Sequence, residues 1–227
     1  MRNRWFIALA AIGLHISIGS VYAWSVLTRP IMADMGFTLS QTTWTFSLAI
    51  LMLGLSAGFL GSFAEKIGPK KSGLLAMLFW VTGLLGTAYA LSIHNLTLLY
   101  LFYGIIGGIG LGIGYITPVS TLVKYFPNRP GFATGLAIMG FGFASLIAGP
   151  LMQYLVAQVG LVDTFIILGV IYLVIMSASS LYLKAPQPKH PTRTTKDKSA
   201  MYVHTHGMLA NDAMKTWQFG ALWWIFF

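Results

Sequence analysis

The chain has 227 residues, of which 56% are hydrophobic and only 8% are charged. Soluble domains carry about 25% charged residues, so this composition excludes an ordinary soluble enzyme and a disordered chain. The absence of cysteine excludes disulfide frameworks and thiolate chemistry, and the net charge of +9 leaves nucleic-acid binding open until the charges are located.

Six stretches are apolar and long enough to cross a membrane as helices, which takes about 20 residues. A seventh begins at Trp217 and reaches the last residue, Phe227, before it is long enough to cross. The sequence therefore predicts an all-α integral membrane protein, with a bundle of six transmembrane helices in residues 1–183, a linker in 184–216 and the truncated start of a seventh helix in 217–227. The six stretches are residues 5–27, 42–63, 73–93, 96–123, 132–155 and 164–183.

The first stretch also has features of a cleaved signal peptide. Arg2 and Arg4 precede its apolar run, and the small-residue pattern Val21-Tyr22-Ala23 resembles a cleavage site. The apolar run is long for a signal peptide, however, and only a retained first helix gives an even number of spans with both ends of the bundle on one side. We therefore expect the first helix to be kept.

The basic residues are distributed asymmetrically about the predicted helices. Every Lys and Arg except Arg29 lies before the first helix, between the second and third, between the fourth and fifth, or after the sixth. Because basic residues stay on the cytoplasmic side of a membrane, we predict a multi-pass protein of the plasma (inner) membrane with a cytoplasmic N-terminus and linker. The charges are then orientation signals, and nucleic acid is not expected as a partner.

The predicted linker contains two nearby histidines, His204 and His206. Two histidines without a third ligand are a weak metal site. Solvated side chains of a polar linker are the interpretation that we favour. No metal and no cofactor are expected.

Glycine recurs at regular spacing within the predicted helices. Gly104, Gly108 and Gly112 lie four residues apart in the fourth stretch. The fifth stretch has a series seven residues apart, namely Gly135, Gly142 and Gly149. In lipid, small residues let helix backbones approach and so supply the contact between helices. Such faces fit a static, tightly packed bundle, and they also fit helices that slide or rock past one another.

Polar residues inside membrane helices are costly and mark functional sites. His15, Tyr22 and Arg29 are seven residues apart in the first helix, so they are predicted to share one face. A similar face of the fourth helix, with Tyr115 close to it, consists of Tyr103, Gly110, Thr117 and Lys124. We predict that the two faces wall a polar cavity. The alternatives are a His15 that is hydrogen-bonded to a neighbouring helix, and tyrosines that pack as core aromatics.

The connection between the second and third helices reads G-S-F-A-E-K-I-G-P-K-K, from Gly61 to Lys71. It resembles the signature of the major facilitator superfamily, with Glu65 where the signature usually has Asp. The resemblance implies the N-terminal six-helix half of a twelve-helix fold, built from two inverted three-helix repeats. It also implies a cytoplasmic gate in which Glu65 meets Lys124 or a helix N-terminus. The gating motif consists of Gly61, Glu65, Lys66, Gly68, Lys70, Lys71 and Lys124.

Further strings are similar to the oxalate/formate antiporter family and, in part, to monocarboxylate transporters. They are N-R-W-F at 3–6, G-S-V-Y-A-W-S-V at 19–26, K-Y-F-P-N-R-P-G-F-A-T-G at 124–135 and M-K-T-W-Q-F-G-A-L-W-W at 214–224. By position, Tyr22 and Tyr115 match aromatic residues that line the family's carboxylate pocket. The family's cations that neutralise the carboxylate lie mainly in the second six helices, so His15 and Arg29 are the basic candidates in this sequence.

The resemblance implies a secondary active transporter that exchanges small carboxylates by alternating access, with Tyr22, Tyr115, His15 and Arg29 at the substrate site. Its expected partners are a small anionic solute, the lipid bilayer and a C-terminal six-helix half. Two alternatives stay open: the same scaffold moving another class of solute, such as a proton-coupled exporter, and a membrane scaffold that moves nothing. The five acidic residues all lie in connections or at helix ends, so no enzyme activity is expected.

Overall fold

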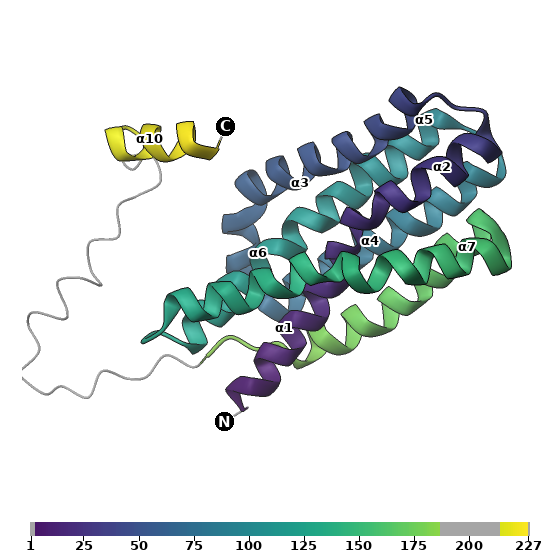
Figure 1. Ribbon diagram of the computed structural model, residues 1–227. Helices are drawn as coiled ribbons and strands as arrows, with labels where there is room; N and C mark the ends of the chain where they lie inside the picture. Colours follow the sequence, from purple (N-terminus) through teal and green to yellow (C-terminus); the bar gives the residue numbers. More distant parts are fainter. Residues whose placement is uncertain (1–2, 187–213, 227) are drawn as a thin grey trace, which may run out of the picture. The chain divides into compact units, whose positions relative to one another are not determined.

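The computed structural model describes residues 3–186 and 214–226. Every regular element in these ranges is a helix, so the all-α prediction is confirmed (Figure 1). Residues Met1–Pro186 form one compact unit and Gln187–Phe227 form a second. The second unit contains helix α10, Trp217–Phe226, where the seventh apolar stretch is predicted.

The first membrane helix is long and interrupted. It consists of α1 (Arg4–Gly19), the short 3₁₀ segment η1 (Ser20–Ala23) and α2 (Trp24–Met35). Gly36, with φ 68° in the left-handed region, ends it. This helix therefore continues beyond residue 27, where the fall in hydropathy predicted its end.

The second and third membrane helices are α3 (Leu39–Ile67) and α4 (Pro69–Ser92). A capping box begins α3: the hydroxyl of Thr38 accepts a hydrogen bond from the N–H of Gln41 at 3.3 Å, and the Gln41 side chain accepts one from the N–H of Thr38 at 2.9 Å. Gly68 joins the two helices with φ 82°, which glycine adopts without a steric penalty. The turn predicted at this glycine is therefore tight.

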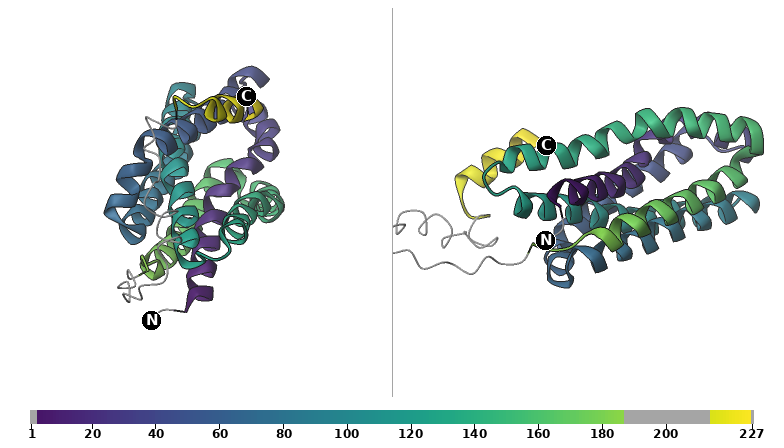
Figure 2. Two further views of the ribbon diagram at one scale, coloured as in Figure 1. Left: turned by 90° about the vertical axis from the view of Figure 1, so that its left-hand side faces the viewer. Right: turned by 90° about the horizontal axis from the view of Figure 1, so that it is seen from below.

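The fourth membrane helix is built from three differently wound parts: α5 (Leu96–Leu99), the π-helical η2 (Tyr100–Gly107) and α6 (Gly108–Tyr125). The last helix of this unit, α7 (Pro130–Tyr182), turns back at Gly160, where φ is 82° and ψ is 177°. Its two segments run in opposite directions (Figure 2). They contain the fifth and sixth predicted stretches.

Five helices among the described residues are long and apolar enough to cross a membrane. The longest of them, α7, contributes two crossings, because each of its segments exceeds the roughly 20 residues that one crossing takes. The six predicted stretches lie within these helices to one residue at their ends.

Glycines of the fourth membrane helix allow close contact with α3. A Cβ atom built on Gly104 would lie 2.9 Å from Cβ of Leu48, and one on Gly108 would lie 2.6 Å from Cβ of Met52. Gly112 repeats the contact against Ser56. The glycines and their partners are each four residues apart, so the two helices meet along matching ridges, as the glycine spacing predicted for this helix.

Two of the three glycines of the other series have no neighbour, whereas a Cβ atom on the third, Gly149, would lie 3.8 Å from Cγ2 of Val26. A Cβ atom on Gly135 or Gly142 of α7 would meet nothing within 4 Å, and the same holds for Gly54 and Gly58 of α3. Within the described part of the chain these faces have no neighbour. They are therefore not responsible for the packing of this unit.

Candidate functional site

Two of the predicted site tyrosines converge on one phenylalanine. Tyr22 comes from η1, Tyr115 from α6 and Phe141 from α7. The ring centroid of Phe141 lies 5.1 Å from that of Tyr22 and 5.2 Å from that of Tyr115, both with edge-to-face geometry. No hydrogen bond joins either tyrosine hydroxyl to another described residue. Both hydroxyls are therefore free to bind a ligand.

The 3₁₀ segment η1 directs Tyr22 out of the core. Its neighbours Val21 and Ala23 are buried, with exposed fractions of 0% and 3%, whereas Tyr22 is 46% exposed. Tighter winding within a longer helix often marks a functional hinge. Here it places a hydrogen-bonding side chain at the surface of an otherwise buried turn.

A groove extends from Tyr22 along α2. It has a volume of about 550 Å³ and lies between one face of α2 and one face of α3. Arg29 is exposed within it, and no described acidic side chain forms an ion pair with its guanidinium. The groove is lined by Tyr22, Trp24, Ser25, Thr28, Arg29, Met32, Leu39, Thr43 and Phe46. It thus combines aromatic walls, hydroxyl groups and one unpaired cation.

His15 lies behind this aromatic group rather than in the groove. Its side chain is fully buried, with Nδ1 2.6 Å from the carbonyl oxygen of Ala137 and Nε2 3.0 Å from that of Tyr115. Its ring also stacks on the Tyr115 ring with a centroid distance of 5.6 Å. The structure therefore places His15 between α1 and two neighbouring helices, which it joins through its ring nitrogens.

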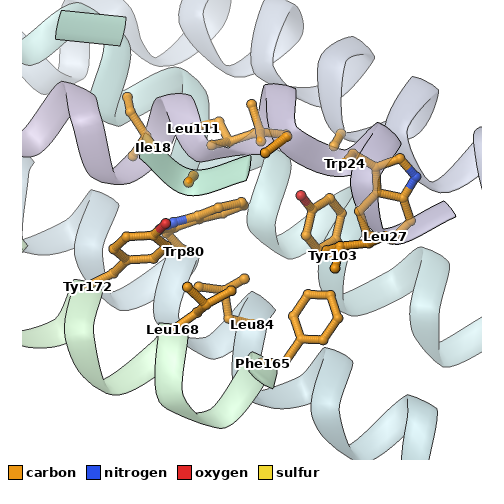
Figure 3. Close-up of a cluster of buried hydrophobic side chains, with 14 of the residues drawn as sticks. Ile18, Trp24, Leu27, Trp80, Leu84, Tyr103, Leu111, Phe165, Leu168 and Tyr172 are labelled. Carbon is orange, nitrogen blue, oxygen red and sulfur yellow. The ribbon is translucent and has the colours of Figure 1, made fainter. Parts of the chain in front are cut away.

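The prediction that Tyr103 and Thr117 wall the cavity is wrong. Tyr103 is 1% exposed, and its ring centroid lies 4.3 Å from that of Trp24 and 5.6 Å from that of Trp80 (Figure 3). Thr117 is buried against α4, where its hydroxyl is 2.6 Å from that of Ser72. These two side chains face the core because α4 covers that side of the fourth membrane helix.

Sequence reasoning missed Phe141 and the α3 side of the groove. The signal for the α2 side was present, since Tyr22, Ser25 and Arg29 are spaced as one helix face. Thr43 carried no comparable signal, because nothing in the sequence shows which helix lies opposite. Phe141 is one of many aromatic residues, and only the packing of α7 against α1 selects it.

Two residues of the gating motif, Glu65 and Lys124, form an ion pair. Nζ of Lys124, at the end of α6, lies 3.2 Å from Oε1 of Glu65, near the end of α3, and both side chains are about half exposed (52% and 48%). Gly61 allows a close approach of α3 to α6, because a Cβ there would lie 3.0 Å from Ile116 Cδ1. The remaining basic residues of the motif, Lys66, Lys70 and Lys71, are exposed and form no ion pair with a described residue.

No group of three His, Cys, Asp or Glu side chains within residues 3–186 and 214–226 is placed to hold a metal ion. The two histidines weighed as metal ligands, His204 and His206, lie outside the described residues. The candidate site consists of aromatic rings, hydroxyl groups and Arg29.

Comparison with known proteins gives consistent matches. Residues 6–227 match the Major Facilitator Superfamily. The chain is 32% identical over 196 residues to the uncharacterized MFS-type transporter YhjX of Escherichia coli (strain K12), covering 86% of this chain and 47% of that protein. It is 27% identical to human monocarboxylate transporter 14, over 88% of this chain and 39% of that protein. With the oxalate:formate antiporter of Oxalobacter formigenes it shares 25% identity over 99% of this chain and 52% of that protein.

The chain thus spans between 39% and 52% of the length of these three relatives. The relatives are transporters rather than enzymes, and they include an oxalate:formate antiporter, as the sequence strings indicated. Because the family match covers residues 6–227, the chain belongs to the Major Facilitator Superfamily.

Proposed function

We propose that the chain forms the N-terminal half of a secondary active transporter that exchanges small carboxylates by alternating access. The observation that carries this proposal is the convergence of Tyr22 and Tyr115 on Phe141, at the end of a groove that holds the unpaired Arg29. The names of two relatives, a monocarboxylate transporter and an oxalate:formate antiporter, point to the same class of solute.

The groove has the chemistry that binds a carboxylate. A carboxylate oxygen accepts hydrogen bonds and carries negative charge, so it pairs with tyrosine hydroxyls and most strongly with a guanidinium. Arg29 draws the anion into the groove, and the hydroxyls of Tyr22 and Tyr115 receive it at the inner end. Aromatic walls around few polar groups are typical of small-molecule sites.

The second half of the pathway would come from a C-terminal bundle of six helices. Alternating access needs two bundles that rock about a shared site, and the relatives have about twice the length that this chain covers. The open glycine faces at Gly54 and Gly58 of α3 and at Gly135 and Gly142 of α7 give such a bundle room for close approach.

The expected setting is the plasma membrane, with the N-terminus and the linker in the cytoplasm. The support is the distribution of basic residues, all of which except Arg29 would then lie on the cytoplasmic side. In that orientation the Glu65–Lys124 pair closes the cytoplasmic end of the pathway. It separates when the cavity opens inward.

Counterflow tests the substrate class. The protein is expressed from its complete reading frame, reconstituted in proteoliposomes and loaded in turn with oxalate, formate, lactate or a cationic drug. Acceleration of labelled-solute uptake by an internal carboxylate, and none by the cation, is the expected result. Uptake driven by the cation alone would contradict the carboxylate assignment, and uptake in no case would contradict transport of these solutes.

Tyr22→Phe is expected to raise the apparent Km for the carboxylate about tenfold, with little change in the amount of folded protein. The substitution removes one hydrogen bond to a charged ligand, a contact worth about 1.5 kcal/mol or more. Tyr89→Phe is the matched control, because Tyr89 is exposed to a similar extent (57%) and lies outside the groove. Equal Km values for the two variants would remove Tyr22 from the site.

Arg29→Gln is expected to raise the apparent Km several-fold and to flatten its dependence on salt, because screening acts only while the cation is present. Arg29→Lys keeps the charge and should retain most of the salt dependence while losing the two-pronged hydrogen bonding of the guanidinium. Initial rates of exchange at low and high ionic strength measure both effects. A neutralised Arg29 with unaltered salt dependence would argue against its role in drawing in the anion.

A further inference from the structure

Both ring nitrogens of His15 face backbone carbonyl oxygens of other helices. Nδ1 is 2.6 Å from the oxygen of Ala137 in α7, and Nε2 is 3.0 Å from the oxygen of Tyr115 in α6. Both distances are those of hydrogen bonds. The residue is fully buried, so water cannot take the place of either partner. One imidazole therefore joins three helices through its two nitrogens.

The two contacts determine how many protons the ring must carry. A carbonyl oxygen only accepts hydrogen bonds, and a neutral imidazole has one N–H group and one lone pair. A neutral ring can therefore satisfy Ala137 or Tyr115 but not both, and its lone pair would point at the other oxygen. An imidazolium has two N–H groups and satisfies both.

We propose that His15 is a proton-binding site at the junction of α1, α6 and α7. When the proton is bound, the ring fastens α1 to both neighbours. When it leaves, one N–H remains, and the junction to α6 or to α7 loses its hydrogen bond. Proton binding here is independent of the proposed carboxylate exchange and does not require it.

The surroundings of the ring support a cation without a counter-ion. Burial disfavours the charged form, and the two charge-assisted hydrogen bonds act against that cost. The ring also stacks on Tyr115, with an interplanar angle of 21°, and lies 5.7 Å from the ring of Phe141, so aromatic faces add to the stabilisation.

The charged and titratable groups facing His15 are few. From α6, the titratable side chain in contact is Tyr115. The α7 residues in contact, Ala137, Gly140 and Phe141, carry no titratable group. No described acidic side chain forms an ion pair with the ring. The proton on His15 is therefore held by backbone oxygens and aromatic faces alone.

Close packing couples this proton to the candidate site. A Cβ atom on Gly140 would lie 3.4 Å from Cβ of His15, so α1 and α7 cross here at short range. Tyr115, which bonds the ring through its carbonyl and stacks on it, also packs against Phe141 in the aromatic group of the groove. Loss of the proton would free Tyr115 or Phe141 to shift.

Nitrogen NMR on a protein with a single histidine tests the proton directly. His94, His190, His204 and His206 are replaced by Asn, so that His15 gives the only histidine signal of this sequence, and the histidine is labelled with nitrogen-15 in lipid nanodiscs. The expected spectrum at neutral pH has the two similar nitrogen shifts of an imidazolium, converting at higher pH to the separated pair of a neutral ring. A separated pair at every pH down to about 5 would overturn the proposal.

Thermal unfolding across pH provides the second measurement. The proposal requires the folded junction to hold the proton more tightly than the unfolded chain does, so the wild-type midpoint should rise by about 4 °C as the pH falls from about 8 to about 5.5. His15→Gln should abolish that rise, and His94→Asn should keep it, since His94 is exposed in a connection. An equal rise in His15→Gln would overturn the proposal. Neither measurement involves the solute, so a failure here is distinct from a failure of the transport proposal.

Discussion

Gly110→Ala is expected to destabilise the helical bundle by about 2–3 kcal/mol, the cost of forcing extra volume into a packed interior. The added methyl group would lie 2.6 Å from the backbone nitrogen of Trp80 and 3.0 Å from the carbonyl oxygen of Ala76. Both atoms belong to the backbone of α4, so no side-chain rotation can relieve the contact. The helices must separate, and separation also breaks the aromatic packing between Trp80 and Tyr103.

The matched control is Gly142→Ala in α7. A Cβ atom at Gly142 would meet nothing within 4 Å, and alanine favours a helix over glycine by about 1 kcal/mol. This variant should be as stable as the wild type or slightly more so. Unfolding in detergent, followed by tryptophan fluorescence, compares the two. If Gly110→Ala unfolds at the same point as Gly142→Ala, the close contact between α6 and α4 is not what stabilises the bundle.

Reversing one charge of the Glu65–Lys124 pair is expected to slow exchange about tenfold while leaving folding almost unchanged. Both side chains are half exposed, so the pair contributes less than about 1 kcal/mol to stability. Its proposed role is to hold the cytoplasmic end closed in one of two states. A shift of about 1.4 kcal/mol in the balance between the states changes their ratio tenfold.

The test is a double-mutant cycle. Glu65→Lys and Lys124→Glu should each slow counterflow, and the double variant, which restores opposite charges at the same distance, should recover most of the wild-type rate. Lys184→Glu, an exposed charge reversal after the sixth crossing, serves as the control and should have little effect. Full-speed exchange by both single variants at normal expression would contradict the gating role.

Most of the fold could be predicted from the length of the apolar stretches and from the residues in the turns. Each crossing needs a continuous apolar stretch, so the six helices could be placed from sequence to within a few residues. The turn at Gly68 followed from a glycine between two helices, and it has the positive φ that glycine permits. The last eight residues of the first helix, 28–35, were missed, because Arg29 and Pro30 lower the hydropathy there although the helix continues to Met35.

The helical periodicity of the sequence identified residues that share a helix face, but not what that face contacts. The spacing of Tyr103 and Thr117 predicted that they share one side of a helix, and the structure buries both side chains. Whether that side meets a cavity or another helix depends on contacts between distant parts of the chain. Tyr103 shows the consequence, since α4 and the first helix enclose it with Trp80 and Trp24 (Figure 3).

The tighter winding of η1 rotates the part of the first helix that follows it, α2, about the helix axis relative to the part that precedes it, α1. A 3₁₀ segment turns about 120° per residue and an α-helix about 100°, so the four residues of η1 (Ser20–Ala23) advance α2 by about 80° relative to an unbroken helix. In an unbroken α-helix Arg29 would lie about 40° behind His15 around the axis, and with η1 it lies about 40° ahead of it. Rewinding η1 as α-helix would rotate Arg29 out of the groove and shorten the segment by only about 2 Å. The half of the helix that lines the groove can therefore be turned by a local change of pitch while the buried half keeps its place.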